Sequence, residues 1–167
     1  MVCLKINNKV KSLNVSRNNI ASDLKVFKMV HKFLNCNKVL EVLNLAYCDL
    51  NEKAGDMIGK GLRGNTNLQS LILKGNPIKS GISEIARSFL FNKKALCLKE
   101  LDLSKCQIQC SDITDDFINM IKSKFTTLKT LSLRHNLIKY QSSQQIRDAL
   151  EINKTITKLP IDYNPIK

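Results

Sequence analysis

The sequence predicts an α/β solenoid, with a parallel sheet of six short strands on the concave side of a curved arc and about five helices on the convex side. An eleven-residue phrase occurs six times, with apolar residues at positions 1, 4, 6 and 11 and Asn or Cys at position 9. Successive phrases begin 28 or 30 residues apart, which is a solenoid period. Between the phrases the apolar spacing changes to three and four, the period of a helix.

The six phrases predict the strands, and they begin at residues 10, 40, 68, 98, 128 and 156. In order they read VKSLNVSRNNI, LEVLNLAYCDL, LQSLILKGNPI, LKELDLSKCQI, LKTLSLRHNLI and ITKLPIDYNPI. Apolar residues at positions 1, 4 and 6 of an extended segment can turn toward one interior, but a single repeat cannot bury that face. Neighbouring strands are therefore expected to pair in parallel, and residues 1–167 to form a single domain.

The segments between the phrases predict five helices behind the sheet. Their helically spaced residues are Leu24, Phe27, Val30, His31 and Leu34; Ala54, Met57, Ile58 and Leu62; Ile82, Ile85, Ala86, Phe89 and Leu90; Ile113, Phe117, Ile118 and Ile121; and Ile146, Ala149, Leu150 and Ile152. A helix is wider than a strand, so the stack is expected to curve, with the strands on its concave side.

Position 9 of each phrase is expected to form the turn that leaves the strand. An Asn side chain there can bond the backbone of the loop, which would otherwise bury unsatisfied polar groups. A cysteine thiol at the same position can serve as a small, weak donor. Down the array the position is occupied by Asn18, Cys48, Asn76, Cys106, Asn136 and Asn164.

The phrases resemble leucine-rich repeats. The alternation of Asn and Cys at position 9 resembles the long-repeat, ribonuclease-inhibitor-like subfamily, until Asn164 interrupts it. The resemblance covers nearly the whole chain and implies a leucine-rich-repeat solenoid shaped as a horseshoe arc. It does not specify a function, because this repeat defines only a scaffold.

Composition favours a soluble intracellular protein. No apolar run approaches the roughly 18 residues of a membrane span, and the first residues lack the apolar block of a secretory signal. The six cysteines are accordingly expected to be reduced. A Lys- and Asn-rich repeat scaffold is interpreted as cytoplasmic, with a cytoskeletal or ciliary assembly as the setting it fits.

The net charge of +13 raises the question of a nucleic-acid partner. Positions 3, 5, 7 and 8 of the phrases should face the concave side. They hold Arg17, Lys74, Lys105, Arg134 and Lys158 against Glu100, Asp102 and Asp162. Most of the excess is therefore dispersed elsewhere, on two helices and at the strand-entry residues Lys11, Lys99 and Lys129. Without a single basic groove interleaved with aromatic residues, nucleic acid is not favoured. An AT-biased coding sequence and an acidic protein partner remain open.

Residue patterns for catalysis, cofactors and metals are absent from the sequence. There is no phosphate-binding glycine loop, and Gly59, Gly61 and Gly64 fall at a predicted helix end. His31 and His135 belong to different repeats and share no expected pocket, and no second Cys or His pair accompanies Cys106 and Cys110. We therefore predict neither an enzyme nor a binder of small molecules.

The concave columns are the best candidate for a binding surface, because the fold does not constrain these side chains. Tyr47, Ile72 and Arg134 are the strongest anchors, since aromatic, apolar and Arg groups supply most interface energy. The full candidate set is Arg17, Asn44, Tyr47, Ile72, Lys74, Asp102, Lys105, Arg134, His135 and Tyr163.

The sequence therefore predicts a non-catalytic protein-interaction scaffold within a larger intracellular assembly. The resemblance also implies three alternatives. Regulation of a small GTPase would require an arginine in the turns after the strands, and only the first turn has one, Arg17. Inhibition of a basic nuclease would require an acidic concave face. Capping of a cytoskeletal filament stays open.

Both ends of the chain are expected to be cut within a repeat. Residues 3–13 align with residues 149–159, which places the start in the last turn of a repeat helix. The chain stops just after the sixth phrase, before its helix. Since solenoid ends usually carry polar caps, we expect further repeats or neighbouring subunits to cover them.

Overall fold

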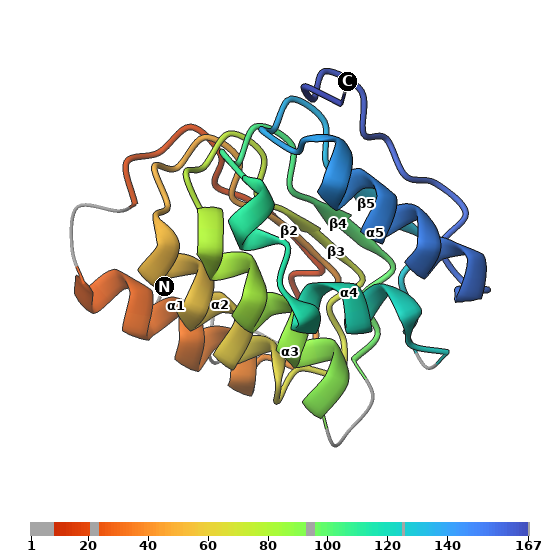
Figure 1. Cartoon of the computed structure of the whole chain (residues 1–167). Helices are drawn as coiled ribbons and strands as arrows, with labels where there is room; N and C mark the ends of the chain where they lie inside the picture. Colours follow the sequence, from red (N-terminus) through yellow and green to blue (C-terminus); the bar gives the residue numbers. More distant parts are fainter. Residues whose placement is uncertain (1–8, 21–23, 93–95, 125, 167) are drawn as a thin grey trace.

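Five short strands form one parallel sheet in the computed structural model, which describes residues 9–20, 24–92, 96–124 and 126–166 (Figure 1). They are β1 (Ser12–Asn14), β2 (Val42–Asn44), β3 (Ser70–Ile72), β4 (Glu100–Asp102) and β5 (Thr130–Ser132), in the spatial order β1-β2-β3-β4-β5. The register aligns the same phrase position in every repeat, so Leu13, Leu43, Leu71, Leu101 and Leu131 lie side by side. The pairing of position 4 with position 4 thus sets the register of the sheet.

Five α-helices lie along one side of the sheet, and each packs against the next (Figure 1). They are α1 (Leu24–Cys36), α2 (Glu52–Leu62), α3 (Ile82–Phe91), α4 (Asp115–Lys122) and α5 (Tyr140–Ile152), with short 3₁₀ turns η2 (Lys79–Gly81) and η3 (Cys110–Asp112). The five helices predicted from the apolar spacing are confirmed. Leu24 and Phe27 belong to α1, but their side chains lie outside the described part of the structure.

The core lies between the sheet and the helices. Leu43, Leu71, Leu101 and Leu131 at position 4 are at most 2% exposed, as are the leucines at position 6, which directly follow β2 to β5. Adjacent helices pack closely at glycine residues. A Cβ on Gly59 of α2, for example, would lie 2.4 Å from the carbonyl carbon of Glu84 in α3. His31 is half-buried, and its backbone contacts Gly61 at the seam between α1 and α2.

The sixth predicted strand is reduced to one bridge, between Thr130 and Lys158. The phrase that begins at Ile156 still runs beside β5, because Leu131 N donates to Lys158 O (3.0 Å) and Leu133 N to Pro160 O (2.8 Å). The proline at position 5 has no N–H for the return bond to β5. The ladder therefore continues without a full strand.

The described residues do not include residues 3–8, on which the predicted alignment of the chain start with residues 149–154 depends. Cys3, Lys93 and Lys94 also lie outside them. Among the other cysteines, Cys36, Cys48, Cys106 and Cys110 carry free thiols. In the parts of the chain that the structure covers, no helix has the length and apolar character needed to cross a bilayer.

Candidate functional site

Position 8 of every phrase adopts a left-handed backbone conformation in the turn after the strand. The φ angles are 59° at Arg17, 55° at Tyr47, 74° at Gly75, 56° at Lys105, 54° at His135 and 59° at Tyr163. This conformation costs roughly 1–2 kcal/mol for a residue with a Cβ. It persists because the position-8 N–H of each of the first five phrases donates to the position-7 carbonyl of the next phrase, as from Tyr47 to Lys74 (2.8 Å).

Position 9 holds the turns of adjacent repeats together. Asn76 Oδ1 accepts from Cys48 N (2.8 Å) and Leu50 N (3.0 Å), and its Nδ2 donates to Leu45 O and Leu73 O. Asn136 makes the equivalent bonds one pair of repeats further on. The prediction that position-9 asparagines bond the loop backbone is confirmed, and the loop they bond includes that of the preceding repeat.

The two position-9 cysteines use their thiols as buried donors. Cys106 Sγ lies 3.4 Å from Leu73 O, and Cys48 Sγ lies 3.2 Å from Val15 O. Burial raises the pKa of the Cys106 thiol to about 12 and also raises the pKa of Cys48. Both groups therefore stay protonated at neutral pH, as a hydrogen-bond donor must.

The position-8 side chains form one exposed line along the edge where the strands end. We call this line the turn row: Arg17, Tyr47, Gly75, Lys105, His135 and Tyr163. The Arg17 guanidinium lies 5.4 Å from the centre of the Tyr47 ring, and the rings of His135 and Tyr163 are parallel within 1° at 4.2 Å.

Gly75 makes room for its neighbour in the turn row. A Cβ on Gly75 would lie 2.3 Å from Cδ1 of Tyr47, so the tyrosine ring extends over the glycine. Tyr47 nonetheless remains 40% exposed, and Tyr163 is 70% exposed. Large aromatic faces are thus held in fixed positions and open to solvent, which suits contact with a partner.

Positions 3 and 5 of the strands lie on the face of the sheet away from the helices, the concave face. A hollow of about 280 Å³ occupies its centre. It is lined by Ser70, Leu71, Ile72, Glu100, Leu101, Asp102, Thr130, Ser132 and Pro160. Two of these residues are carboxylates and none is a Lys or Arg, so the floor of the concave face is acidic in its middle. Cations stand beside it, in the turn row.

The ten residues predicted as a binding surface divide among the strands, the turn row and the position before the turn row. Asn44, Ile72 and Asp102 lie on the strands. Arg17, Tyr47, Lys105, His135 and Tyr163 belong to the turn row, and Lys74 and Arg134 occupy the position before it. The prediction omitted Ser70, Glu100, Thr130 and Ser132, although they occupy the same columns and line the hollow.

Several polar side chains of this surface already have partners. Asn44 Oδ1 accepts from Ala46 N, and Asp102 Oδ1 accepts from Ser104 N, both at 2.9 Å. Arg134 Nε lies 2.7 Å from a carboxylate oxygen of Asp162 in the next repeat. The hydrogen bond and charge of Arg134 lower the pKa of Asp162. These contacts fix side chains that still face solvent.

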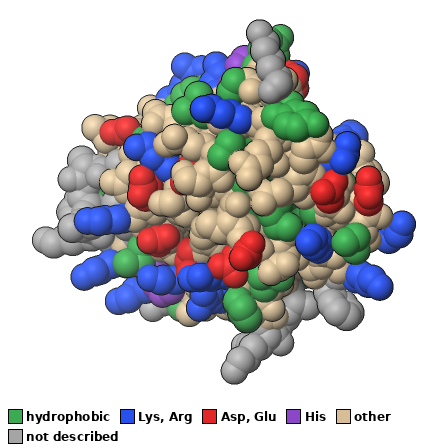
Figure 2. Space-filling model, in the orientation of Figure 1, with side chains coloured by type: hydrophobic (Ala, Val, Ile, Leu, Met, Phe, Trp, Pro, Cys, Tyr) green, Lys and Arg blue, Asp and Glu red, His purple; other side chains and the backbone are tan. Residues whose placement is uncertain are grey.

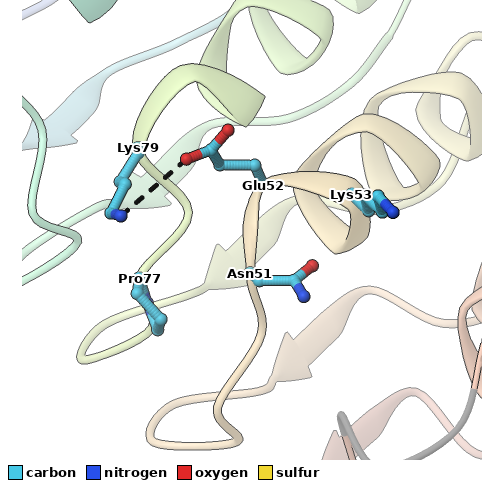
Figure 3. A pocket seen from close by; sticks show the side chains of 5 residues that line it. All are labelled: Asn51, Glu52, Lys53, Pro77 and Lys79. Carbon is cyan, nitrogen blue, oxygen red and sulfur yellow. Dashed lines mark ion pairs between the residues drawn. The ribbon is translucent and has the colours of Figure 1, made fainter.

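A second hollow, of about 340 Å³, lies between the starts of α2 and η2 (Figure 3). It is lined by Asn51, Glu52, Lys53, Pro77 and Lys79. Glu52 faces Lys79 across it at 3.9 Å and accepts from Ser80, while Lys53 points away. Asn51 caps α2 by accepting from Ala54 N. The polar groups that line this hollow mostly bond one another or cap α2. The hollow is therefore a weaker candidate for a binding site than the concave face.

Within the described ranges, no three His, Cys, Asp or Glu side chains are grouped as metal ligands. His31 lies at the helix seam, whereas His135 lies in the turn row. On the helical side, Figure 2 shows Lys and Arg side chains intermixed with Asp and Glu. The helical side therefore presents mixed charges to solvent.

Short parallel strands, helices behind them and an asparagine ladder at the turns define a class of curved repeat proteins. A family model described as Leucine Rich repeat matches residues 7–23, 64–83 and 94–116. These segments are leucine-rich repeats, and the chain has the leucine-rich-repeat fold, consistent with repeats of the long, ribonuclease-inhibitor-like type.

Two solved structures share this fold. One is the leiomodin-1 actin-binding site 2, with a TM-score of 0.57 and 20% identity, over 95% of this chain and 74% of that chain. The other is the tropomodulin C-terminal domain from Caenorhabditis elegans, with a TM-score of 0.63 and 13% identity, over 87% of this chain and 85% of that one. Such identities establish the fold alone. No curated protein matches the sequence.

Proposed function

We propose that this chain is a non-catalytic protein-interaction module that binds a partner across the turn row and the concave face. The turn row carries the proposal. Its exposed aromatic and cationic side chains are held by stacking and by left-handed turns, five of them at residues other than glycine. Backbone strain of this kind is found where a surface must present side chains in one arrangement. Pre-arranged aromatic and Arg groups lower the entropic cost of binding.

The partner we infer is a cytoskeletal filament protein, with actin as the first candidate. Support comes from the shared fold with the actin-binding site of leiomodin-1. A solenoid also presents a long surface, which suits a repeating filament better than a small ligand. In this proposal the module acts as one part of a larger assembly, in the cytoplasm.

Co-sedimentation with purified actin filaments tests this proposal. Tyr47→Asn and Tyr163→Asn remove two rings, while Asn tolerates the left-handed conformation. We expect the double variant to bind at least tenfold more weakly than the natural protein. Tyr140→Asn is the matched control, since Tyr140 is 56% exposed but belongs to α5. No binding by the natural protein, or equal binding by the double variant, would overturn the proposal.

A further inference from the structure

Five exposed lysines gather at the edge where the last strands begin, opposite to the turn row. We call them the entry-edge cluster: Lys99, Lys122, Lys124, Lys129 and Lys154. Lys99 and Lys129 immediately precede β4 and β5, Lys122 ends α4, and the other two lie in loops that lead into strands. In Figure 1 these loops lie together with the ends of the helices, toward the lower right.

The sheet brings the first two lysines together. Lys129 N donates to Lys99 O (2.8 Å), and Thr157 N to Lys129 O (2.9 Å). The two lysines therefore lie side by side at the starts of adjacent strands, whose backbones lie about 4.8 Å apart. The Lys99 ammonium donates to Gln69 Oε1, a neutral group, so its charge is retained.

Bonds between the loops place the other lysines beside them. Asn153 Nδ2 donates to Ile121 O (2.6 Å), which sets Lys154 next to Lys122. Thr127 Oγ1 lies 2.7 Å from Leu98 O, which joins the loop of Lys124 to the start of β4. Asn153 is buried and Thr127 is partly buried, so the five positions belong to a rigid frame.

The cluster has almost no acidic company. Of the ion pairs in the described residues, none involves any of its five members. The nearby carboxylates are Glu151 in the last turn of α5 and Glu100, which follows Lys99 and accepts a hydrogen bond from Ser70 on the concave face. At the other end of this strand-entry edge, beside β1, lysines do have partners. Lys11 pairs with Glu41 (2.9 Å), and Lys38 caps α1 by donating to Asn35 O.

The fold explains only part of this charge. Lysines at helix C-termini favour the helix dipole, which accounts for Lys122 and for Lys154 just beyond α5. Lys99 and Lys129 enter strands, and strands offer no such compensation. Five like charges on a rigid edge repel one another, and an acidic partner would relieve that repulsion.

We propose that the entry-edge cluster docks an acidic segment of a partner protein, as a second interaction surface separate from the turn row. The choice of a protein segment rests on two features. Ile152, 47% exposed in the last turn of α5, supplies an apolar contact beside the lysines. Among the exposed aromatic residues that the structure describes, Tyr47, Tyr140 and Tyr163 lie at the other edge of the sheet. Phe91, the last residue of α3, offers a single ring rather than a series of rings for stacking on bases.

Fluorescence anisotropy with a labelled polyglutamate peptide tests the proposal at physiological ionic strength. We expect Lys99→Glu with Lys129→Glu to weaken binding at least tenfold. Lys28→Glu with Lys32→Glu changes the net charge equally on exposed residues of α1, and should weaken binding less than twofold. Urea unfolding of both pairs checks that the fold is retained, and Lys99→Gln with Lys129→Gln repeats the test with a smaller perturbation.

The proposal would be overturned if the natural protein did not bind the peptide, or if both charge-reversal pairs weakened peptide binding equally. It would also be overturned if Lys99→Glu with Lys129→Glu weakened binding of a single-stranded oligonucleotide of matched charge but not of the peptide. Filament co-sedimentation of the same variants separates this surface from the turn row. If the turn row alone contacts the filament, the Lys99 and Lys129 variants sediment normally while failing to bind the peptide.

Discussion

The side-chain oxygen of Asn76 lies 2.8 Å from the backbone nitrogen of Cys48, 28 residues earlier in the chain. The same oxygen accepts from Leu50 N, and the amide nitrogen donates to the carbonyls of Leu45 and Leu73. One buried side chain thus satisfies four backbone groups in two repeats. Because both partners have fixed positions in the phrase, this contact sets how one phrase aligns with the next as well as the shape of the turn.

Asn76→Ala should therefore unfold the protein more easily. Two N–H groups and two carbonyls would lose their partner in a buried site, and each net hydrogen bond contributes about 1 kcal/mol. We expect a loss of about 3–4 kcal/mol in the free energy of unfolding, measured by urea denaturation with unchanged m-value.

Asn18→Ala is the matched control for this prediction. Asn18 occupies the same position of the first phrase, but it is exposed and donates within its own turn, to Val15 O and Ser16 O. The expected loss is about 1 kcal/mol or less. If both substitutions cost the same, the bonds between repeats are not what stabilises the stack.

The turn row predicts opposite effects for two substitutions at equivalent positions. Gly75→Ala places a Cβ in a left-handed turn and against the Tyr47 ring, so we expect it to destabilise the protein by about 1–3 kcal/mol. Lys105→Gly relieves a left-handed residue that has a Cβ, and should stabilise the protein by up to about 1 kcal/mol. Thermal unfolding of the pair checks both values, and a destabilising Lys105→Gly would contradict the assigned strain.

The repeat phrase was enough to predict most of the fold. The apolar positions of one phrase decide which side chains face the core, and equal phrase lengths decide the register, as for Leu71 and Leu101. The exception was the sixth strand. Pro160 has no backbone N–H to donate to β5, and the spacing of apolar residues gives no sign of that loss. Position-9 chemistry was also predictable, because Asn has few other ways to satisfy a buried turn.

The candidate site was predicted less completely. Tyr, Lys and Arg do not favour left-handed turns, so only Gly75 and, more weakly, His135 signalled the conformation of position 8. The stacking of His135 on Tyr163 depends on rotamers that join two repeats. Likewise, Lys122 and Lys154 join Lys129 only after loops from separate repeats fold against each other. Such contacts are not local in sequence.

Acid titration should reveal the ion pair beside the turn row. Arg134 lowers the pKa of Asp162, so the carboxylate should remain ionised below the pH at which an ordinary Asp is protonated. Any stability from the pair is present above the unfolded-state pKa and is lost as the pH falls through the lowered value. Carboxyl carbon NMR shifts measure this titration directly.

Substitution of Arg134 tests whether this residue lowers the pKa of Asp162. In Arg134→Gln the pKa of Asp162 should rise toward its ordinary value, because its main hydrogen bond and nearest charge are gone. Arg87→Gln removes a comparable pair, with Asp116 on α4, and should leave the Asp162 curve unchanged. A curve for Asp162 that does not respond to Arg134→Gln would show that the pair is not formed in solution.

Thiol alkylation should separate the cysteines by their environments. The thiolate is the reactive species, and the hydrogen bond from Ser142 lowers the pKa of the half-buried Cys110. Burial instead raises the pKa of Cys106 to about 12, so its thiolate forms only at strongly alkaline pH. With iodoacetamide at neutral pH, we expect peptide mass spectrometry to find Cys110 modified in the folded protein and Cys106 unmodified.

Two comparisons make the alkylation result specific to the repeat turns. Ser142→Ala should slow the reaction of Cys110 at neutral pH, because the bond that stabilises its thiolate is lost. Cys106 should react only as fast as the whole protein unfolds, since its Sγ bonds Leu73 O between two repeats and is fully buried. Urea should therefore accelerate Cys106 along the unfolding transition, whereas exposed Cys36 reacts at all concentrations. Labelling of Cys106 at urea concentrations well below that transition would mean that the turn containing Cys106, between Asn76 and Asn136, opens locally. The stack would then not be one cooperative unit.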